Sequence, residues 1–321
     1  MSENPLSALS AEGFSTFYED TIEPALTEFE QDRQRDIRLV YASIVIAAIG
    51  AGIVFLLDTD SSLLSFFGMA LIVAGIAGQH VVRKRMNTAL KNALVAPVCA
   101  FFGLTYTQKP VRMPINRFIR AGLLPAQYDK FSTEDQINGT HKGVAVDLCE
   151  LTLTRTVRDK DKDTSSDETI FQGMILTYSF AKPFTGETRI LSNSSGLLGW
   201  LSRSGLKPQQ AGERVHLEDP VFEEQFNVYS TDQVEARYLL TPRFMERLVA
   251  LSAHFSERNG VSVAFSESDI LICLRSGKDR FEGGGLFKQL NSRERVEELL
   301  GELNQVLGIV DVLDLTNQTR I

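Results

Sequence analysis

Two long segments without a charged residue stand out in the pattern of hydrophobic and polar positions. Nineteen uncharged residues lie between Arg38 and Asp58, and twenty-two more lie between Asp60 and Arg83. An α-helix needs about 20 apolar residues to cross the roughly 30 Å hydrocarbon core of a bilayer. Neither segment has the polar stripe that a core helix of a soluble protein normally shows. The pattern therefore predicts a tight transmembrane helical hairpin over residues 37–83.

The residues before this hairpin have a different, amphipathic pattern. Aromatic and aliphatic side chains recur at helical spacing from Phe14 to Phe29, and acidic residues occupy the positions between them. This spacing predicts a cytoplasmic amphipathic helix within residues 1–36. Pro24 lacks a backbone N–H, so we expect the helix to be bent or interrupted near it.

The residues after the hairpin predict a short basic region and then a folded domain. Residues 84–125 continue as a helix to about Phe102 and then become rich in turn residues. Over residues 126–321 the pattern is that of an α+β domain with a mixed, mainly antiparallel sheet and packed helices. The expected strands are 144–157, 170–181, 188–191, 214–217, 261–265 and 270–274, with a charged loop at 158–169, and the expected helices are 242–259 and 293–307.

The charges are distributed unevenly along the chain. Residues 1–60 carry a net charge of −8, residues 61–128 carry +8 with no acidic residue, and residues 129–321 carry −8. Arg and Lys flank the hairpin on the side of both termini, whereas its turn holds only Asp58 and Asp60. By the positive-inside rule, both termini are expected in the cytoplasm. The acidic remainder of the chain argues against a nucleic-acid partner.

The basic middle block predicts contact with membrane lipids. One interpretation is that its cations hold this region against an anionic leaflet. The other is that they only set the topology or pair with the acidic N-terminal helix. The expected membrane-surface residues are Arg83, Lys84, Arg85, Lys109, Arg112, Arg117 and Arg120.

Small residues recur every four positions in both apolar segments. They are Ser43, Ala47 and Ala51 in the first, and Ala70, Ala74 and Gly78 in the second. Each set lies on one helix face, where two backbones can approach closely. We expect this face to be the hairpin's own seam, and a homo-oligomer interface is the alternative.

Residue patterns that would indicate catalysis, a metal or a cofactor do not occur in the sequence. Cys99, Cys149 and Cys273 are far apart and are expected to be buried free thiols, and the four histidines have no metal-ligand spacing. The glycines at 283–285 lack the GxxxxGK and GxGxxG contexts of nucleotide sites. We therefore expect no metal, no cofactor and a binding or scaffolding module, with a membrane-anchored enzyme as the alternative.

Three sequence stretches resemble a known bacterial family. They are FYEDTIEPALTEFEQDR near the N-terminus, FQGMILTYSFAKPF at 171–184 and FEEQFNVYSTDQVEARYLLTP at 222–242. Together with the membrane hairpin, they resemble a family of two-pass membrane proteins with a domain of unknown function. The resemblance implies residence in the bacterial inner membrane, a cytoplasmic C-terminal domain and a LemA-like protein as partner. It implies no catalytic residues.

Two places in the domain are candidates for ligand or membrane contact. Asp232, Glu235, Arg237 and Tyr238 lie together in the third stretch, and a carboxylate beside a guanidinium can bind a substrate or partner. A structural role competes with this interpretation, through a capping box formed by Ser230 and Gln233 and a local ion pair of Glu235 with Arg237. The apolar segment around Trp200 is expected in the core, with the membrane interface as the alternative.

Overall fold

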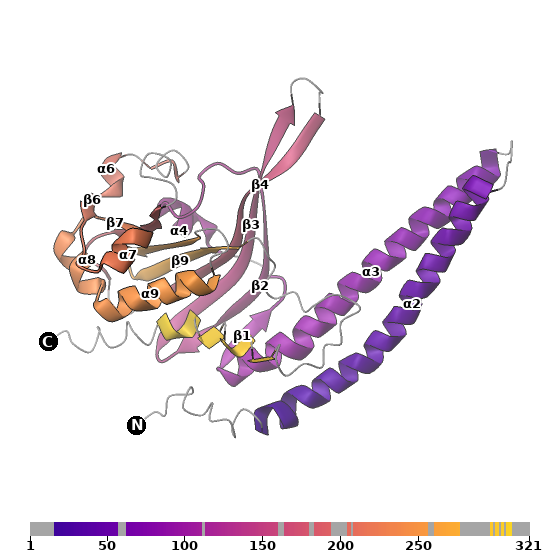
Figure 1. The fold of residues 1–321 in the computed structure, drawn as a ribbon, viewed down its shortest axis with the longest axis horizontal. Coiled ribbons are helices and arrows are strands. Elements are labelled where there is room, and N and C mark those ends of the chain that lie inside the picture. Colours follow the sequence, from indigo (N-terminus) through magenta and orange to yellow (C-terminus); the bar gives the residue numbers. More distant parts are fainter. Residues whose placement is uncertain are drawn as a thin grey trace. The chain divides into compact units, whose positions relative to one another are not determined.

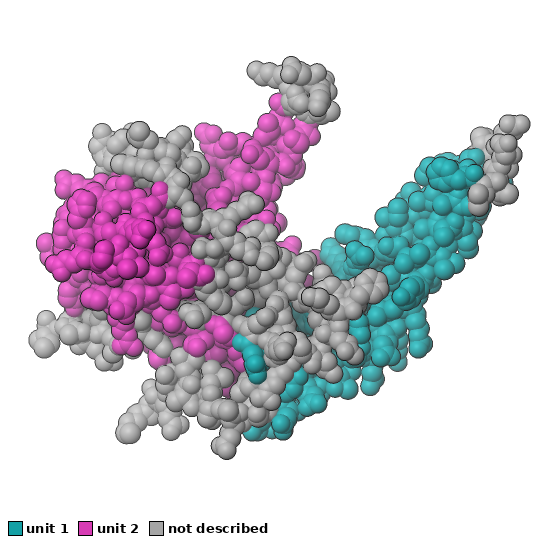
Figure 2. Space-filling model, in the orientation of Figure 1, with its two compact units in different colours: residues 1–98, 281–299 teal, residues 99–280, 300–321 magenta. Residues whose placement is uncertain are grey.

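The protein divides into two compact units, coloured separately in Figure 2. The first comprises residues Met1–Val98 and Phe281–Leu299, and the second comprises Cys99–Arg280 and Leu300–Ile321. The domain start expected at residue 126 thus falls inside the second unit. The computed structural model describes residues 16–56, 62–110, 113–159, 164–179, 183–193, 204–206, 208–255 and 260–276, and positions 296, 297, 299–301, 303, 304 and 306–309.

Two long helices form most of the first unit (Figure 1). Helix α2 spans Glu23–Leu56 and helix α3 spans Ser62–Phe101. At 1.5 Å per residue they are about 51 Å and 60 Å long. Each contains a segment that is long and apolar enough to cross a membrane. The amphipathic N-terminal helix and the helix after the second apolar segment are therefore continuous with the two apolar segments.

The outer surface of this helical pair is apolar. Fifteen of the twenty large hydrophobic side chains that are exposed in the described part of the chain lie between Leu39 and Val81. The buried positions of α2 and the turn before it follow one another at alternating steps of four and three residues. They are Ile22, Leu26, Phe29, Arg33, Asp36, Val40 and Ser43, and the buried Gly50 follows one full repeat of seven residues later. A repeat of seven residues is the pattern of a left-handed coiled coil, so the two helices pack along a narrow seam.

Glycines form the part of the seam that lies between the apolar segments. A Cβ atom on Gly50 would lie 2.6 Å from the carbonyl oxygen of Gly68, and one on Gly75 would lie 2.6 Å from that of Ser43. The seam predicted for the first segment is confirmed at Ser43 and Ala47. For the second it is confirmed at Gly78 and wrong at Ala70 and Ala74, which are exposed because Gly68 and Gly75 make the close approach instead.

The predicted irregularity near Pro24 takes the form of a π-helical turn. This turn, η1, spans Tyr18–Ile22, and the N–H of Glu23 donates to the carbonyl oxygen of Tyr18. Pro24 has no N–H to offer to the preceding turn, which is why an α-helical ladder does not continue through this point.

A nine-stranded sheet forms the second unit. The strands are β1 (Leu104–Thr107), β2 (Lys130–His141), β3 (Val144–Asp159), β4 (Thr164–Ser179), β5 (Thr188–Ser192), β6 (Glu213–Val215), β7 (Phe226–Ser230), β8 (Val261–Ser266) and β9 (Asp269–Arg275). Their spatial order is β1-β2-β3-β4-β9-β8-β5-β7-β6. Every pairing between these described strands is antiparallel, so the α+β class is confirmed and the mixed sheet is replaced by an antiparallel one.

The charged segment at 158–169 differs from the expected loop. Arg158 and Asp159 end β3, and residues 164–169 begin β4, with Arg158 opposite Ser165. The two strands therefore continue past the rest of the sheet as a two-stranded ribbon (Figure 1). Both faces of this ribbon meet solvent, so its sequence lacks the alternation of apolar and polar residues that marks a half-buried strand. For this reason the polar sequence suggested a loop.

The helices of the second unit pack on both faces of the sheet. The short helix α4 (Ile115–Arg120) buries Ile115 and Phe118 against a cluster that includes Cys149, Leu151 and Ile175. On the opposite face, α9 (Pro242–Phe255) places Phe244 5.6 Å from the ring of Phe265. Described positions between 296 and 309 are helical, as expected for 293–307. Those from Leu300 onward belong to this unit, where the Tyr178 hydroxyl donates to the carbonyl oxygen of Val306.

Candidate functional site

The sequence-predicted residues Asp232 and Glu235 stabilise a turn and a loop. Asp232 is the N-cap of helix α8 (Gln233–Leu239), and its carboxylate accepts the N–H groups of Val234 and Glu235 at 3.0 and 2.9 Å. These backbone donors, with the Thr185 hydroxyl, lower the pKa of Asp232 below its usual value. The cap is therefore Asp232 rather than the expected Ser230, whose hydroxyl instead accepts from the N–H of Asp232 at 3.0 Å.

Glu235 holds the loop that precedes strand β5. Its two carboxylate oxygens accept the backbone N–H groups of Thr185 and Gly186 at 2.8 and 2.7 Å, and its side chain is buried. Gly186 approaches so closely that a Cβ atom there would lie 2.7 Å from the Cβ of Asp232. Asp232 and Glu235 thus act together on the same loop, which favours the structural role.

Arg237 and Tyr238 do not converge on this pair. Both are exposed, and Arg237 donates to the backbone and side-chain oxygens of Gln233, four residues earlier on the same helix, at 3.0 and 3.1 Å. Asp232 therefore caps a helix and Glu235 binds a loop, whereas Arg237 and Tyr238 lie on the surface. The four residues do not form one pocket.

A buried arginine beside this loop joins three segments of the chain. The Arg189 side chain is 2% exposed. Its Nε and Nη1 donate to the carbonyl oxygens of Ala121 and Gln210, each at 2.9 Å, and Nη2 pairs with the Glu187 carboxylate. A buried cation is costly unless it is fully paired, and here it is paired on three sides. Sequence reasoning missed Arg189 because nothing in its local pattern marks it as buried.

The cations expected at the membrane surface have different surroundings. Arg83, Lys84 and Arg85 are exposed on α3, and Lys109 and Arg120 are exposed in the second unit. Arg117 forms an ion pair with Asp269 of β9 at 2.6 Å, so it serves internal pairing. Arg112 lies outside the described residues, as do the segment around Trp200, the glycines at 283–285 and the turn at 58–60.

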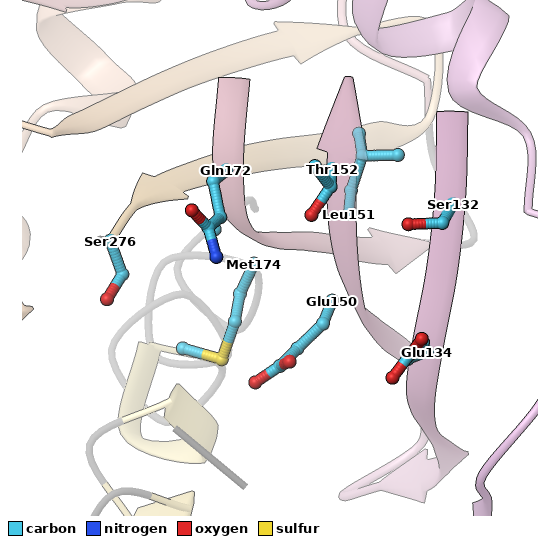
Figure 3. Close-up of a pocket in the computed structure, with 9 residues that line it drawn as sticks. Ser132, Glu134, Glu150, Leu151, Thr152, Gln172, Met174 and Ser276 are labelled. Atoms are coloured by element: carbon cyan, nitrogen blue, oxygen red, sulfur yellow. The ribbon is translucent and has the colours of Figure 1, made fainter. Parts of the chain in front are cut away.

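A small polar pocket on the sheet was not predicted from the sequence (Figure 3). Residues of the neighbouring strands β2, β3 and β4 line it, with Glu134 directly opposite Glu150 and Thr152 opposite Gln172. Ser276, just after β9, completes one side through its N–H bond to the carbonyl oxygen of Gln172 at 3.0 Å. The cavity holds about 160 Å³, which is less than the 300–1,000 Å³ of most small-molecule sites. Its residues lie far apart in the sequence, so only the strand register reveals it.

The thiols of the second unit lie in apolar surroundings. Cys99, Cys149 and Cys273 are buried and unpaired by disulfides, as expected. Burial raises the pKa of both Cys99 and Cys149 to about 12, which keeps them as neutral thiols at physiological pH. Within the described part of the chain, no group of three His, Cys, Asp or Glu residues is placed to hold a metal ion.

The comparisons with known proteins identify a domain but no activity. Residues 169–315 match the family described as "Protein of unknown function (DUF3137)", a match that begins within β4. This match confirms the domain of unknown function, which is one part of what the resemblance implied. None of the curated proteins matches the chain.

One solved structure shows a distant likeness. It is the crystal structure of the mycobacterial trehalose monomycolate transport factor A, TtfA, with 13% identity and a TM-score of 0.37. The match covers 70% of this chain and 96% of that chain. A likeness at this score carries no argument about function.

Proposed function

We propose that this protein is a two-pass protein of the bacterial inner membrane, with both termini in the cytoplasm and a sheet unit that acts there as a binding or scaffolding module. The observation that carries the proposal is the apolar outer surface of α2 and α3 between Leu39 and Val81. In water such a surface would be far larger than the apolar patches that soluble proteins expose. In a bilayer it faces lipid tails, and the glycine seam supplies the close packing that membrane helices need.

The positions of the cations support the orientation. Exposed arginines and lysines lie on α2 just before the apolar band and on α3 just after it, and the sequence between the two helices holds only Asp58 and Asp60 as charged residues. Cytoplasmic loops carry such an excess of Arg and Lys, so the second unit is expected in the cytoplasm.

The ribbon formed by β3 and β4 is the surface that we assign to partner binding. The register of β2 with β3 ends at the Lys130 and Thr154 pair, and that of β9 with β4 ends at the Arg275 and Gly173 pair. Beyond these points the ribbon has no further neighbour among the described strands. Two-stranded ribbons are marginally stable alone, and open strand edges can accept an added strand from a partner.

Site-specific crosslinking in native membranes tests this proposal. A photoreactive residue at Val157, in the ribbon and 42% exposed, should capture a defined protein partner, and a LemA-like protein is the first one to look for. The matched control is Val221, 54% exposed and outside the ribbon, where the same capture is not expected. Equal capture at both positions, or none at Val157, would contradict the proposed binding surface.

The pocket favours a second candidate function, a membrane-anchored enzyme. Two glutamates placed directly opposite on antiparallel strands repel each other, and such pairs are normally avoided. If the pocket serves chemistry, the double variant Glu134→Gln and Glu150→Gln should fail to complement a deletion strain while crosslinking at Val157 continues. If the module account holds, complementation and crosslinking should be lost or kept together.

A further inference from the structure

We infer that five exposed cations from both helices form one belt that binds the phosphate groups of anionic phospholipids. They are Arg35, Arg38, Arg83, Lys84 and Arg85, called the cation belt below. The inference rests on the proposed membrane hairpin and deepens it, because it names the lipid class and adds α2 to the contact surface. It also separates these cations from the basic residues of the sheet unit.

The antiparallel register of the helices places the five cations at one level. Gly50 approaches Gly68, Gly75 approaches Ala47, and Gly78 approaches Ser43. The residue numbers of these partners sum to values near 120. Both helices rise by the same amount per residue, so the register can be extended to earlier residues of α2 and later residues of α3. It then places Arg38 level with residue 82 and Arg35 level with Arg85.

The belt lies where the apolar surface ends. Leu39, Tyr41 and Val81 are the last large apolar side chains exposed on this side, and Tyr41 adds an aromatic ring of the kind that favours the headgroup region. Beyond the belt, η1 and the first turns of α2 carry the acidic residues Glu19, Asp20, Glu23, Glu28, Glu30 and Asp32. The boundary between tails and headgroups is therefore marked by a change from apolar to cationic side chains on both helices.

Local pairing leaves the belt available to lipid. Arg33, the other arginine of this region, is buried and forms an ion pair with Glu30 at 2.5 Å, so it is not part of the belt. Arg35 lies 3.4 Å from Asp32, but both side chains are more than half exposed. Such exposed pairs contribute little and exchange readily for a phosphate partner.

Helix α3 continues well past the belt before the chain enters the sheet. Sixteen residues follow Arg85 within α3, which corresponds to about 24 Å. That length is roughly three Debye lengths at physiological ionic strength. Lys109 and Arg120 belong to the second unit and are far in sequence from the apolar segments, so we assign lipid binding to the belt, which directly adjoins these segments, and not to them.

Native mass spectrometry of the full chain in neutral detergent tests the assignment. The probes are phosphatidylglycerol and phosphatidylcholine of the same acyl chains, and inorganic phosphate serves as competitor. The variant Arg35→Gln with Arg38→Gln should weaken phosphatidylglycerol binding about tenfold, since each well-placed cation contributes substantially. Phosphatidylcholine binding should not change, and phosphate should not displace the lipid. Displacement by phosphate would mean that the belt is a free-anion site.

The matched control also removes two positive charges, but from the sheet unit, in the variant Lys109→Gln with Arg120→Gln. It should bind phosphatidylglycerol like the unchanged chain, and Arg35→Lys with Arg38→Lys should restore most of the lost affinity. The assignment is overturned if the control loses as much affinity as the belt variant, or if the belt variant loses none. Helical content and incorporation into phosphatidylcholine nanodiscs are measured in parallel, because a chain that fails to incorporate contradicts the membrane hairpin and not the belt.

Discussion

The sheet unit and the apolar segments of the helical unit bury opposite kinds of side chain. In the sheet unit the apolar residues point inward, as Ile175 and Phe265 do, and the exposed faces are polar. Along the apolar segments of the helical unit, small residues such as Gly50 and Gly75 lie in the seam, and large apolar residues such as Ile76 and Phe66 point outward. One chain therefore follows two rules of burial. The difference is explained if the two units fold in different solvents, water for the sheet and lipid for the helices.

Buried charge sharpens the same contrast. In the sheet unit Arg189 is buried because backbone carbonyls and Glu187 surround it. Among the described residues of the helical unit, Arg33 and Lys91 are buried, and the other five arginines and lysines are exposed at one level of the helix pair. The buried cation of the sheet unit joins segments of the chain, whereas the exposed cations of the helices adjoin an apolar surface, where we propose that they contact the membrane.

The largest effect is expected from removing the buried charge of the sheet unit. Arg189→Met leaves the carbonyl oxygens of Ala121 and Gln210 without their donor, and it leaves Glu187 without its partner. The free energy of unfolding should fall by about 3 kcal/mol. Thermal unfolding of the full chain in detergent measures the change. The control Arg237→Met, on an exposed side chain of α8, should stay within about 0.5 kcal/mol. Equal losses for both variants would show that Arg189 is not a structural centre.

The next effect compares one substitution in the two units. Ile76→Arg places a cation on the outer surface of α3, and Val234→Arg places one on α8, at side chains that are 60% and 80% exposed. An arginine facing lipid near the middle of a span costs about 2.5–3.5 kcal/mol in insertion, whereas one facing water costs almost nothing. The amount of chain recovered in the membrane fraction should drop for Ile76→Arg alone. If both variants insert equally well, the outer surface of α3 does not face lipid.

A smaller effect concerns a carboxyl group of the sheet. Burial raises the pKa of Asp147 above its usual value, although Gln136 donates to it at 2.8 Å. Because its pKa is raised in the folded state, Asp147 contributes stability that is fully present below its unfolded pKa of about 3.9. This contribution is lost as the pH rises through the pKa of the folded state. Asp147→Asn removes this loss and keeps an acceptor for Gln136. The melting temperature should therefore rise at pH 7, on the order of 1 °C, and the difference should vanish near pH 3. A variant that is less stable at pH 7 would mean that the charge of Asp147 is needed.

Much of the architecture could be predicted because it depends on local periodicity. The two apolar segments, the helix beginning at Pro242 and the strands on either side of Glu267 all have a repeat that is visible within a few residues. Strands β1, β2 and β7 were not predicted, because their sequences are polar or belong to motifs that suggested turns. They form strands only through pairing with their neighbours in the sheet.

The candidate sites were harder to predict because they depend on contacts between distant residues. Asp232 and Glu235 stand near each other in sequence, yet their partners in the 185–186 loop are nearly fifty residues away. The facing pair of Glu134 and Glu150 depends on the register of β2 with β3, which includes a bulge between Glu134 and Ile137. A bulge shifts which residues share a face, and sequence periodicity alone does not reveal it.

The most direct test of the membrane account is the location of the C-terminus. A protein that fluoresces only in the cytoplasm and alkaline phosphatase, which is active only in the periplasm, are each fused after Ile321, and the membranes are then extracted with alkaline carbonate. The account predicts fluorescence, no phosphatase activity and retention of the chain in the membrane pellet. Phosphatase activity at Ile321 would contradict the orientation, and release by carbonate would contradict the transmembrane hairpin itself.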